Sequence, residues 1–157
     1  MNLFLVTDGG SRGNPGPSAS AAICYDSAGT IIWEKGILLE GDRTNNWAEY
    51  AAVVLALQET LSRGENEAHI ELLSDSSIVI NQINGKYKVN RNRNKLHVMY
   101  DEAKELLEQF PNITFKHIPR DFSQDADTLV NKVLDENRVN NKNVPNFLKT
   151  KFQHGTD

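Results

Sequence analysis

An apolar segment that stops at an acidic residue and two glycines opens the chain: Leu3-Phe4-Leu5-Val6-Thr7-Asp8-Gly9-Gly10-Ser11. The apolar part predicts a buried β-strand over residues 2–7, and the glycines predict a turn from 9 to 17. Asp8 would then stand at the end of a strand, where helix capping does not explain an acid. In an α/β sheet such strand ends meet at the crevice in which ligands bind.

Three further motifs carry acids at the ends of other elements: Asn45-Asn46-Trp47-Ala48-Glu49, Leu73-Ser74-Asp75-Ser76 and Asp125-Ala126-Asp127. Taken singly, Glu49 can pair with Asn46 in a helix cap, and Asp75 can cap the next helix. Asp125 and Asp127 suit the first turn of the last helix. Taken together, clustered carboxylates repel one another unless a hard divalent cation compensates them. The pattern indicates metal-dependent phosphoryl chemistry with two Mg²⁺ ions, for which Mn²⁺ is the expected substitute.

Hydrophobic periodicity predicts the remaining elements. We expect strands at 18–26, 30–39, 69–74 and 112–118, and helices at 47–63, 76–84, 95–110 and 123–137. This order predicts an α/β fold: a mixed five-stranded sheet, with three antiparallel strands and then parallel ones, flanked by helices. Residues 1–137 would form one catalytic domain. Residues 138–157 read as a polar C-terminal tail that either docks on the domain or is disordered.

The bulk composition is that of a soluble globular protein, with 157 residues, 39% hydrophobic and 24% charged. The net charge of −4 argues on its face against nucleic-acid binding. Acids gathered at a metal site are neutralised by the metal, however, so the local pattern matters more. The single Cys24 cannot form an internal disulfide and reads as a buried strand residue. The opening apolar segment is too short for a signal sequence or a membrane span, so a cytoplasmic location is expected.

With the turn Gly13-Asn14-Pro15-Gly16-Pro17 and the segment His117-Ile118-Pro119-Arg120, these motifs resemble, in order and spacing, the type 1 ribonuclease H family over about residues 2–137. The resemblance implies an endonuclease that hydrolyses the RNA strand of RNA/DNA hybrids by a two-metal mechanism, leaving 5′-phosphate and 3′-hydroxyl products. The four metal-binding and catalytic carboxylates would be Asp8, Glu49, Asp75 and Asp127. Asp127 is preferred to Asp125 because it follows Ala126, as in the family's Ala-Asp pair. Substrate contacts would come from Gly10, Ser11, Asn14, Asn45, Asn46 and Arg120.

The amide side chains suit this assignment because they both donate to and accept from a ribose 2′-hydroxyl. A turn role for Asn14 and a cap role for Asn46 are compatible alternatives. Trp47 and Tyr50, close to Glu49 in the sequence, either touch the substrate or belong to the core.

Two departures from the family's pattern concern the loop before the last helix and the basic protrusion. The segment 120–124 lacks the loop histidine, and the chain looks like the branch that carries arginine there, so Arg120 would handle phosphate. That branch often has asparagine where Ser123 stands. His117 suits a structural role at the end of its strand better than catalysis. The long protrusion is replaced by a short basic segment, 85–95, which is either a phosphate-binding patch or a solvated loop.

The main alternative is a ribonuclease H-like nucleic-acid-binding domain with weak or no activity. Retention of all four acids argues against it, because a pure binder would not need them. An integrase or transposase core shares the architecture, but the Gly-Asn-Pro-Gly turn and the Asn-Asn pair do not fit one well. The expected partner is an RNA/DNA hybrid, with no membrane association, no obligate protein partner and a monomeric state.

Overall fold

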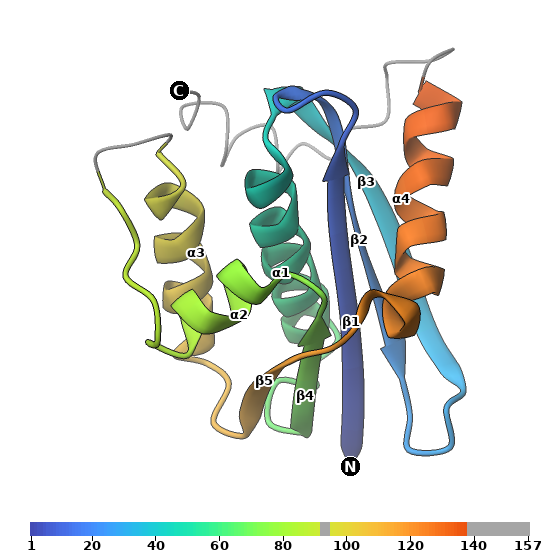
Figure 1. The fold of residues 1–157 in the computed structure, drawn as a ribbon. Helices are drawn as coiled ribbons and strands as arrows, with labels where there is room; N and C mark the ends of the chain where they lie inside the picture. Colours follow the sequence, from blue (N-terminus) through green and yellow to red (C-terminus); the bar gives the residue numbers. More distant parts are fainter. Residues whose placement is uncertain (92–94, 138–157) are drawn as a thin grey trace.

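The computed structural model describes residues 1–91 and 95–137, so the expected tail at 138–157 lies outside the described residues. Five strands form one mixed sheet in the order β3-β2-β1-β4-β5 (Figure 1). Their bounds are β1 Asn2–Ser11, β2 Gly16–Tyr25, β3 Ile31–Arg43, β4 His69–Ser74 and β5 Ile113–His117. β1, β2 and β3 pair antiparallel, whereas β1, β4 and β5 run parallel. The expected fold class and sheet are confirmed.

The helices follow the predicted order, with one short 3₁₀ turn added before the last. They are α1 Asn45–Ser62, α2 Ser77–Ile83, α3 His97–Leu107, η1 Arg120–Ser123 and α4 Gln124–Asn137. Within the described residues, no helix is both long and apolar enough to cross a membrane.

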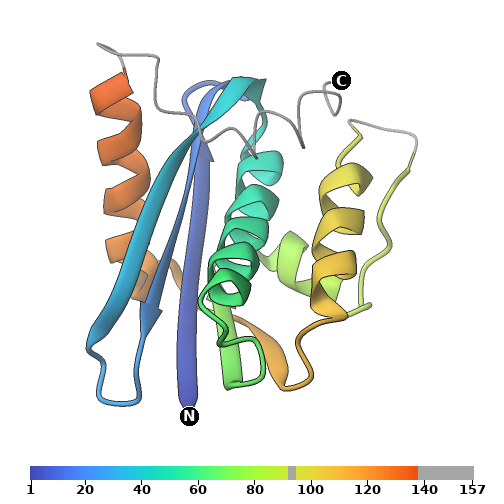
Figure 2. The same cartoon turned by 180° about the vertical axis from the view of Figure 1, so that it is seen from behind.

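The two faces of the sheet are covered by different helices, α1 with α2 and α3 on one face and α4 on the other (Figures 1 and 2). Successive side chains of β1 point to opposite faces of the sheet, so the strand contributes apolar residues to both. Leu3 and Leu5 enter the main core with α1, whereas Val6 packs with Ala126 of α4. Cys24 is buried in the main core, as expected.

The first strand is longer than its apolar segment predicts. β2 continues to pair with it as far as Ser11 opposite Ser18, so the expected turn shrinks to residues 12–15. On its other side the parallel partner β4 ends earlier, with Thr7 opposite Ser74. Asp8 therefore lies inside β1, immediately after its parallel pairing ends.

The first helix begins two residues earlier than expected. Thr44 caps it, because its Oγ1 accepts a hydrogen bond of 3.1 Å from the backbone N–H of Trp47. The alternative in which Asn46 and Glu49 cap this helix is therefore not found. Ser76, rather than Asp75, caps α2.

Candidate active site

The parallel register of β1 and β4 brings two of the predicted acids together. Thr7 is paired with Ser74. The residues that follow them, Asp8 in β1 and Asp75 after β4, therefore lie next to each other where the parallel pairing ends. This is the carboxyl edge of the parallel part of the sheet, where α/β proteins bind ligands.

A close approach of α1 to β1 brings in the third acid. A Cβ atom on Gly9 would lie 2.2 Å from the carbonyl carbon and oxygen of Ala48, so only glycine permits this contact. Glu49 follows in the helix, and its Oε1 accepts a hydrogen bond of 2.9 Å from the Gly9 N–H. From the next strand, Ser20 Oγ donates to the Ala48 carbonyl at 2.6 Å. The glycine after Asp8 thus positions Glu49.

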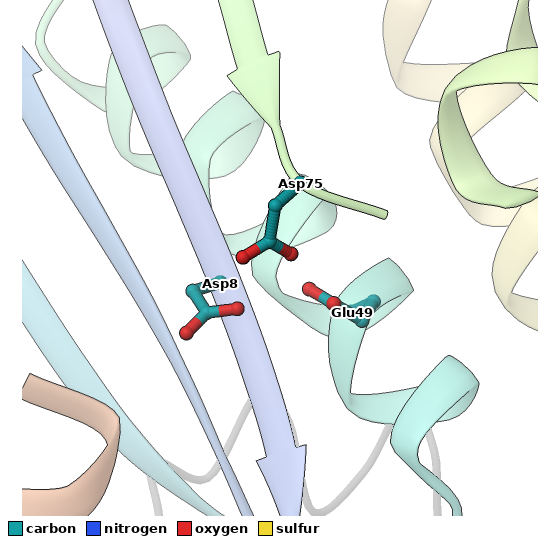
Figure 3. A group of neighbouring side chains, drawn as sticks. All are labelled: Asp8, Glu49 and Asp75. Atoms are coloured by element: carbon teal, nitrogen blue, oxygen red, sulfur yellow. The ribbon is translucent and has the colours of Figure 1, made fainter. Parts of the chain in front are cut away.

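The carboxylates of Asp8, Glu49 and Asp75 point toward one another (Figure 3). One oxygen from each lies within 4.8 Å of the others. They come from β1, α1 and the end of β4, so the fold brings together acids that are 26 to 67 residues apart in the sequence. An oxygen-only donor set at this spacing suits a hard divalent cation.

Burial and mutual repulsion perturb this group strongly. Burial, followed by the charges of Asp75 and Asp127, raises the pKa of Asp8 to about 7. Burial, followed by the charges of Asp8 and Asp75, also raises the pKa of Glu49 well above its usual range, although the Gly9 N–H acts in the opposite direction. In the metal-free protein these acids therefore bind protons more tightly than ordinary carboxyl groups do, and a cation at the same oxygens would compete with those protons.

Asp127, in the first turn of α4, completes the acidic cleft. Its proximity helps to raise the pKa of Asp8, and it lines a cleft of about 400 Å³ with the other three acids. Asp125 does not line this cleft, and its Oδ2 accepts a hydrogen bond of 3.2 Å from the Tyr25 hydroxyl instead. The geometry favours Asp127 over Asp125, as the sequence pattern does.

Some of the predicted substrate residues lie on the rim of the cleft, and three of the predicted residues are joined by hydrogen bonds. Gly10, Ser11 and Asn45 line the cleft, whereas Asn14 and Asn46 do not. Asn45 Oδ1 accepts from the Ser11 N–H at 2.9 Å, and Asn14 Oδ1 accepts from the Asn45 N–H at 3.0 Å. Asn14 therefore orients Asn45, and this bond joins the β1–β2 turn to the start of α1.

The turn η1 carries two groups toward Asp75. Arg120 lines the cleft, and its Nε lies 3.8 Å from Asp75 Oδ2, while its side chain is 87% exposed. Ser123 Oγ donates a hydrogen bond of 2.8 Å to the same Oδ2. His117 ends β5 with Nε2 at 3.2 Å from the Asp75 backbone oxygen, which agrees with a structural role.

Trp47 and Tyr50 belong to the core and not to the substrate surface, since both are buried. Tyr50 donates its hydroxyl hydrogen to Gln82 Oε1 and packs edge-on against Tyr100. In the basic segment, Arg91 makes two hydrogen bonds of 2.9 and 3.0 Å to Asp101. Residues 92–94 of that segment lie outside the described part of the chain.

Several residues of the cleft were missed by sequence reasoning. They are Arg12, Val130, Asn131 and Leu134, which line the cleft, and Ser123, which contacts Asp75. A signal for three of them was available, because positions 130, 131 and 134 follow Asp127 at the spacing of one helical face. Ser123 had no such signal, since its contact depends on the path of η1.

The chain matches known proteins across the described fold. A family model described as reverse transcriptase-like matches residues 6–133. Ribonuclease H of Clostridium botulinum is 33% identical over 154 residues, covering 87% of this chain and 98% of the relative. The structure of RNase H1 from Halobacterium salinarum is 36% identical, with a TM-score of 0.79, covering 87% of this chain and 99% of that one.

LC11-RNase H1, solved in complex with an RNA/DNA hybrid, is 34% identical with a TM-score of 0.80, covering 85% of this chain and 97% of that one. The chain spans only 36% of the length of other curated relatives, among them a bifunctional protein of Mycobacterium tuberculosis. The sequence motifs, the order of the strands, the acidic cleft and the relatives of matching length all point to the same family. The chain belongs to the type 1 ribonuclease H family.

Proposed function

We propose that this chain is a metal-dependent endonuclease that hydrolyses the RNA strand of RNA/DNA hybrids, leaving 5′-phosphate and 3′-hydroxyl ends. The observation that carries the proposal is the meeting of Asp8, Glu49 and Asp75, from three separate elements, with oxygens within 4.8 Å of one another. The solved hybrid complex of LC11-RNase H1 supports the choice of substrate.

Asp8, Glu49, Asp75 and Asp127 would hold two divalent cations, Mg²⁺ or Mn²⁺. When bound, such cations supply Lewis-acid activation of water and compensation of the charge that develops on the phosphate. The protein holds the ligands in place beforehand: the Gly9 N–H fixes Glu49, and the strand register fixes Asp8 beside Asp75. Preorganised oxygen donors need little rearrangement when the substrate arrives.

Recognition of the RNA strand is assigned to the rim of the cleft. Asn45 presents its amide there, held by Ser11 and Asn14, and an amide can both donate to and accept from a ribose 2′-hydroxyl. Gly10 and Ser11 offer backbone close to the carboxylates, and Asn46 stands beside Asn45 in the first turn of α1. Arg120 has a largely exposed guanidinium suited to a phosphate oxygen.

The decisive experiment is cleavage of an end-labelled RNA/DNA hybrid with Mg²⁺ or Mn²⁺. Matched double-stranded RNA and DNA, and a reaction with EDTA, serve as controls. Metal-dependent cutting of the RNA strand in the hybrid alone is the expected result. Pure protein that binds the hybrid without cutting it would identify a nucleic-acid-binding domain instead.

The proposed enzyme acts as a monomer in the cytoplasm, and residues 1–137 form its catalytic domain. The core clusters of the described residues lie between Leu3 and Leu134, within the proposed domain. Light scattering with and without hybrid tests the monomeric state, and cell fractionation tests the location.

A further inference from the structure

We infer that Ser123 is a positioning residue for Asp75: its hydroxyl fixes one carboxylate oxygen and thereby orients Asp75 for the cation. The inference rests on the proposed function, because Asp75 matters as a ligand only if the cleft binds metal.

The carboxylate of Asp75 is confined on nearly all sides. Its side chain is only 7% exposed, and it faces Asp8 and Glu49, which repel it. Ser123 Oγ is 2.8 Å from Asp75 Oδ2, within the range of a strong hydrogen bond to a charged oxygen. The nearest cationic group, Arg120 Nε, lies farther away at 3.8 Å on a side chain that is 87% exposed. Ser123 thus makes the shorter contact with Asp75, and its side chain is buried where that of Arg120 is exposed.

Ser123 is itself held rigidly. It is fully buried and ends η1, immediately before α4 begins at Gln124. Its hydroxyl oxygen lies 2.8 Å from Asp75 Oδ2 and 3.1 Å from the Arg120 carbonyl oxygen. The hydroxyl has a single hydrogen to donate, and the shorter distance and the negative charge favour the carboxylate. A side chain fixed in this way has little rotational freedom to lose when it orients its neighbour.

The contact also joins the two halves of the cleft. Asp75 follows β4 and Asp127 lies in α4, and Ser123 directly precedes α4. A hydrogen bond from Ser123 to Asp75 therefore fixes η1, with Arg120, and the start of α4 relative to the parallel strands. Groups of this kind, which hold a metal ligand without touching the metal, tune metal affinity.

The test compares the full-length wild type with Ser123→Ala, Ser123→Thr and Thr60→Val. Thr60 is a matched control, since its buried hydroxyl bonds the Ala56 carbonyl in α1 and does not line the cleft. Isothermal titration with Mn²⁺ alone, without nucleic acid, gives metal affinity. The Mg²⁺ concentration at half-maximal cleavage gives the metal requirement during turnover. Circular dichroism melts show whether each variant is folded.

We expect Ser123→Ala to weaken Mn²⁺ binding about 10–100-fold and to raise the Mg²⁺ requirement in parallel. At saturating Mg²⁺ most of the cleavage rate should return. Ser123→Thr, which keeps the hydroxyl, should retain most of the affinity, and Thr60→Val should bind Mn²⁺ like the wild type. If the threonine variant melts early because its methyl group is overpacked, Ser123→Asn takes its place, since its amide also donates.

Unchanged Mn²⁺ affinity in folded Ser123→Ala would overturn the inference, whatever happened to its melting temperature. A wild type that binds Mn²⁺ but does not cut hybrid would refute the proposed function while leaving the Ser123 comparison decisive. A wild type that binds no Mn²⁺ would refute both.

Discussion

At the scale of single residues, the cleft holds buried carboxylates that repel one another, and a bound cation would compensate their charge. Asp8 is 6% exposed and lies against Glu49, Asp75 and Asp127. Its pKa is raised to about 7 by burial first and by the neighbouring charges second. Such an arrangement costs stability in the empty protein and is retained where it serves a function.

The first prediction concerns Asp8→Asn. The neutral amide removes a cation ligand and also relieves repulsion, so Mg²⁺-dependent cleavage should be abolished. The metal-free protein at pH 8 should become more stable by on the order of 1–3 kcal/mol. Hybrid cleavage and urea denaturation in EDTA measure the two effects. An Asp8→Asn protein that still cleaves would overturn the assignment of the metal ligands.

The second prediction separates the two acids at the start of α4. Asp127→Asn should lower the cleavage rate at least about tenfold, because Asp127 lines the cleft and contacts Asp8. Asp125→Asn is the matched control and should cleave at nearly the wild-type rate, since its carboxylate contacts Tyr25. Initial rates at saturating hybrid decide the matter. Equal losses in both variants would mean that the start of α4 had been disturbed as a whole.

At the scale of elements, Gly9 sets the distance between β1 and α1. In Gly9→Ala the new methyl group would lie 2.2 Å from the Ala48 backbone, so strand and helix must separate. We expect a loss of at least about 2 kcal/mol in the free energy of unfolding. The adjacent Gly10→Ala is the control, because its Cβ meets only Val130 Cγ1 at 3.5 Å and should change stability by less than about 1 kcal/mol. Equal stability of both variants, by urea denaturation, would contradict this account of Gly9.

The elements were largely predictable from the sequence because their signals are local. The apolar alternation and the order of strands and helices yielded the sheet, and the four acidic motifs named the four acids that line the cleft. The cap of α1 was missed because Thr44 and Asn46 both carry side chains that can cap a helix, and asparagine is the more favoured of the two. In the structure Thr44 caps the helix. The extension of β1 to Ser11 depends on its pairing with β2. Ser123 depends on tertiary geometry alone.

At the scale of the whole molecule, the fourth prediction concerns pH. The raised pKa values of Asp8 and Glu49, caused chiefly by burial, mean that the folded state binds protons more tightly than the unfolded state. The contribution of Asp8 to the free energy of unfolding is therefore fully present below its unfolded pKa of 3.8, and it is lost as the pH rises through about 7. Urea denaturation in EDTA from pH 4.5 to 8 should show this fall, and Asp8→Asn should reduce it.

Other acids do not reverse this trend within that range. Hydrogen bonding to Arg91 lowers the pKa of Asp101, and Lys35 and Arg63 lower that of Glu59 against the opposing effect of its burial. Groups with lowered pKa values lose their stabilising effect only as pH falls below their ordinary values, 3.8 and 4.5. Stability that rose steadily from pH 4.5 to 7 would contradict the repulsion among the buried carboxylates of the cleft.

The fifth prediction joins the cleft to the stability of the whole domain. The four acids come from β1, α1, the end of β4 and α4, so a cation that binds them holds together elements from both faces of the sheet. A ligand at 100 times its dissociation constant stabilises the folded state by about 2.7 kcal/mol. For a domain of this size each kcal/mol raises the Tm by roughly 2–4 °C.

Protons compete with the cation for Asp8, so the rise in Tm should be larger at pH 8 than at pH 5. Thermal melts with MgCl₂, against NaCl at equal ionic strength, measure it. Asp8→Asn should abolish most of the rise, and an undiminished rise in that variant would place the stabilising cation outside the cleft.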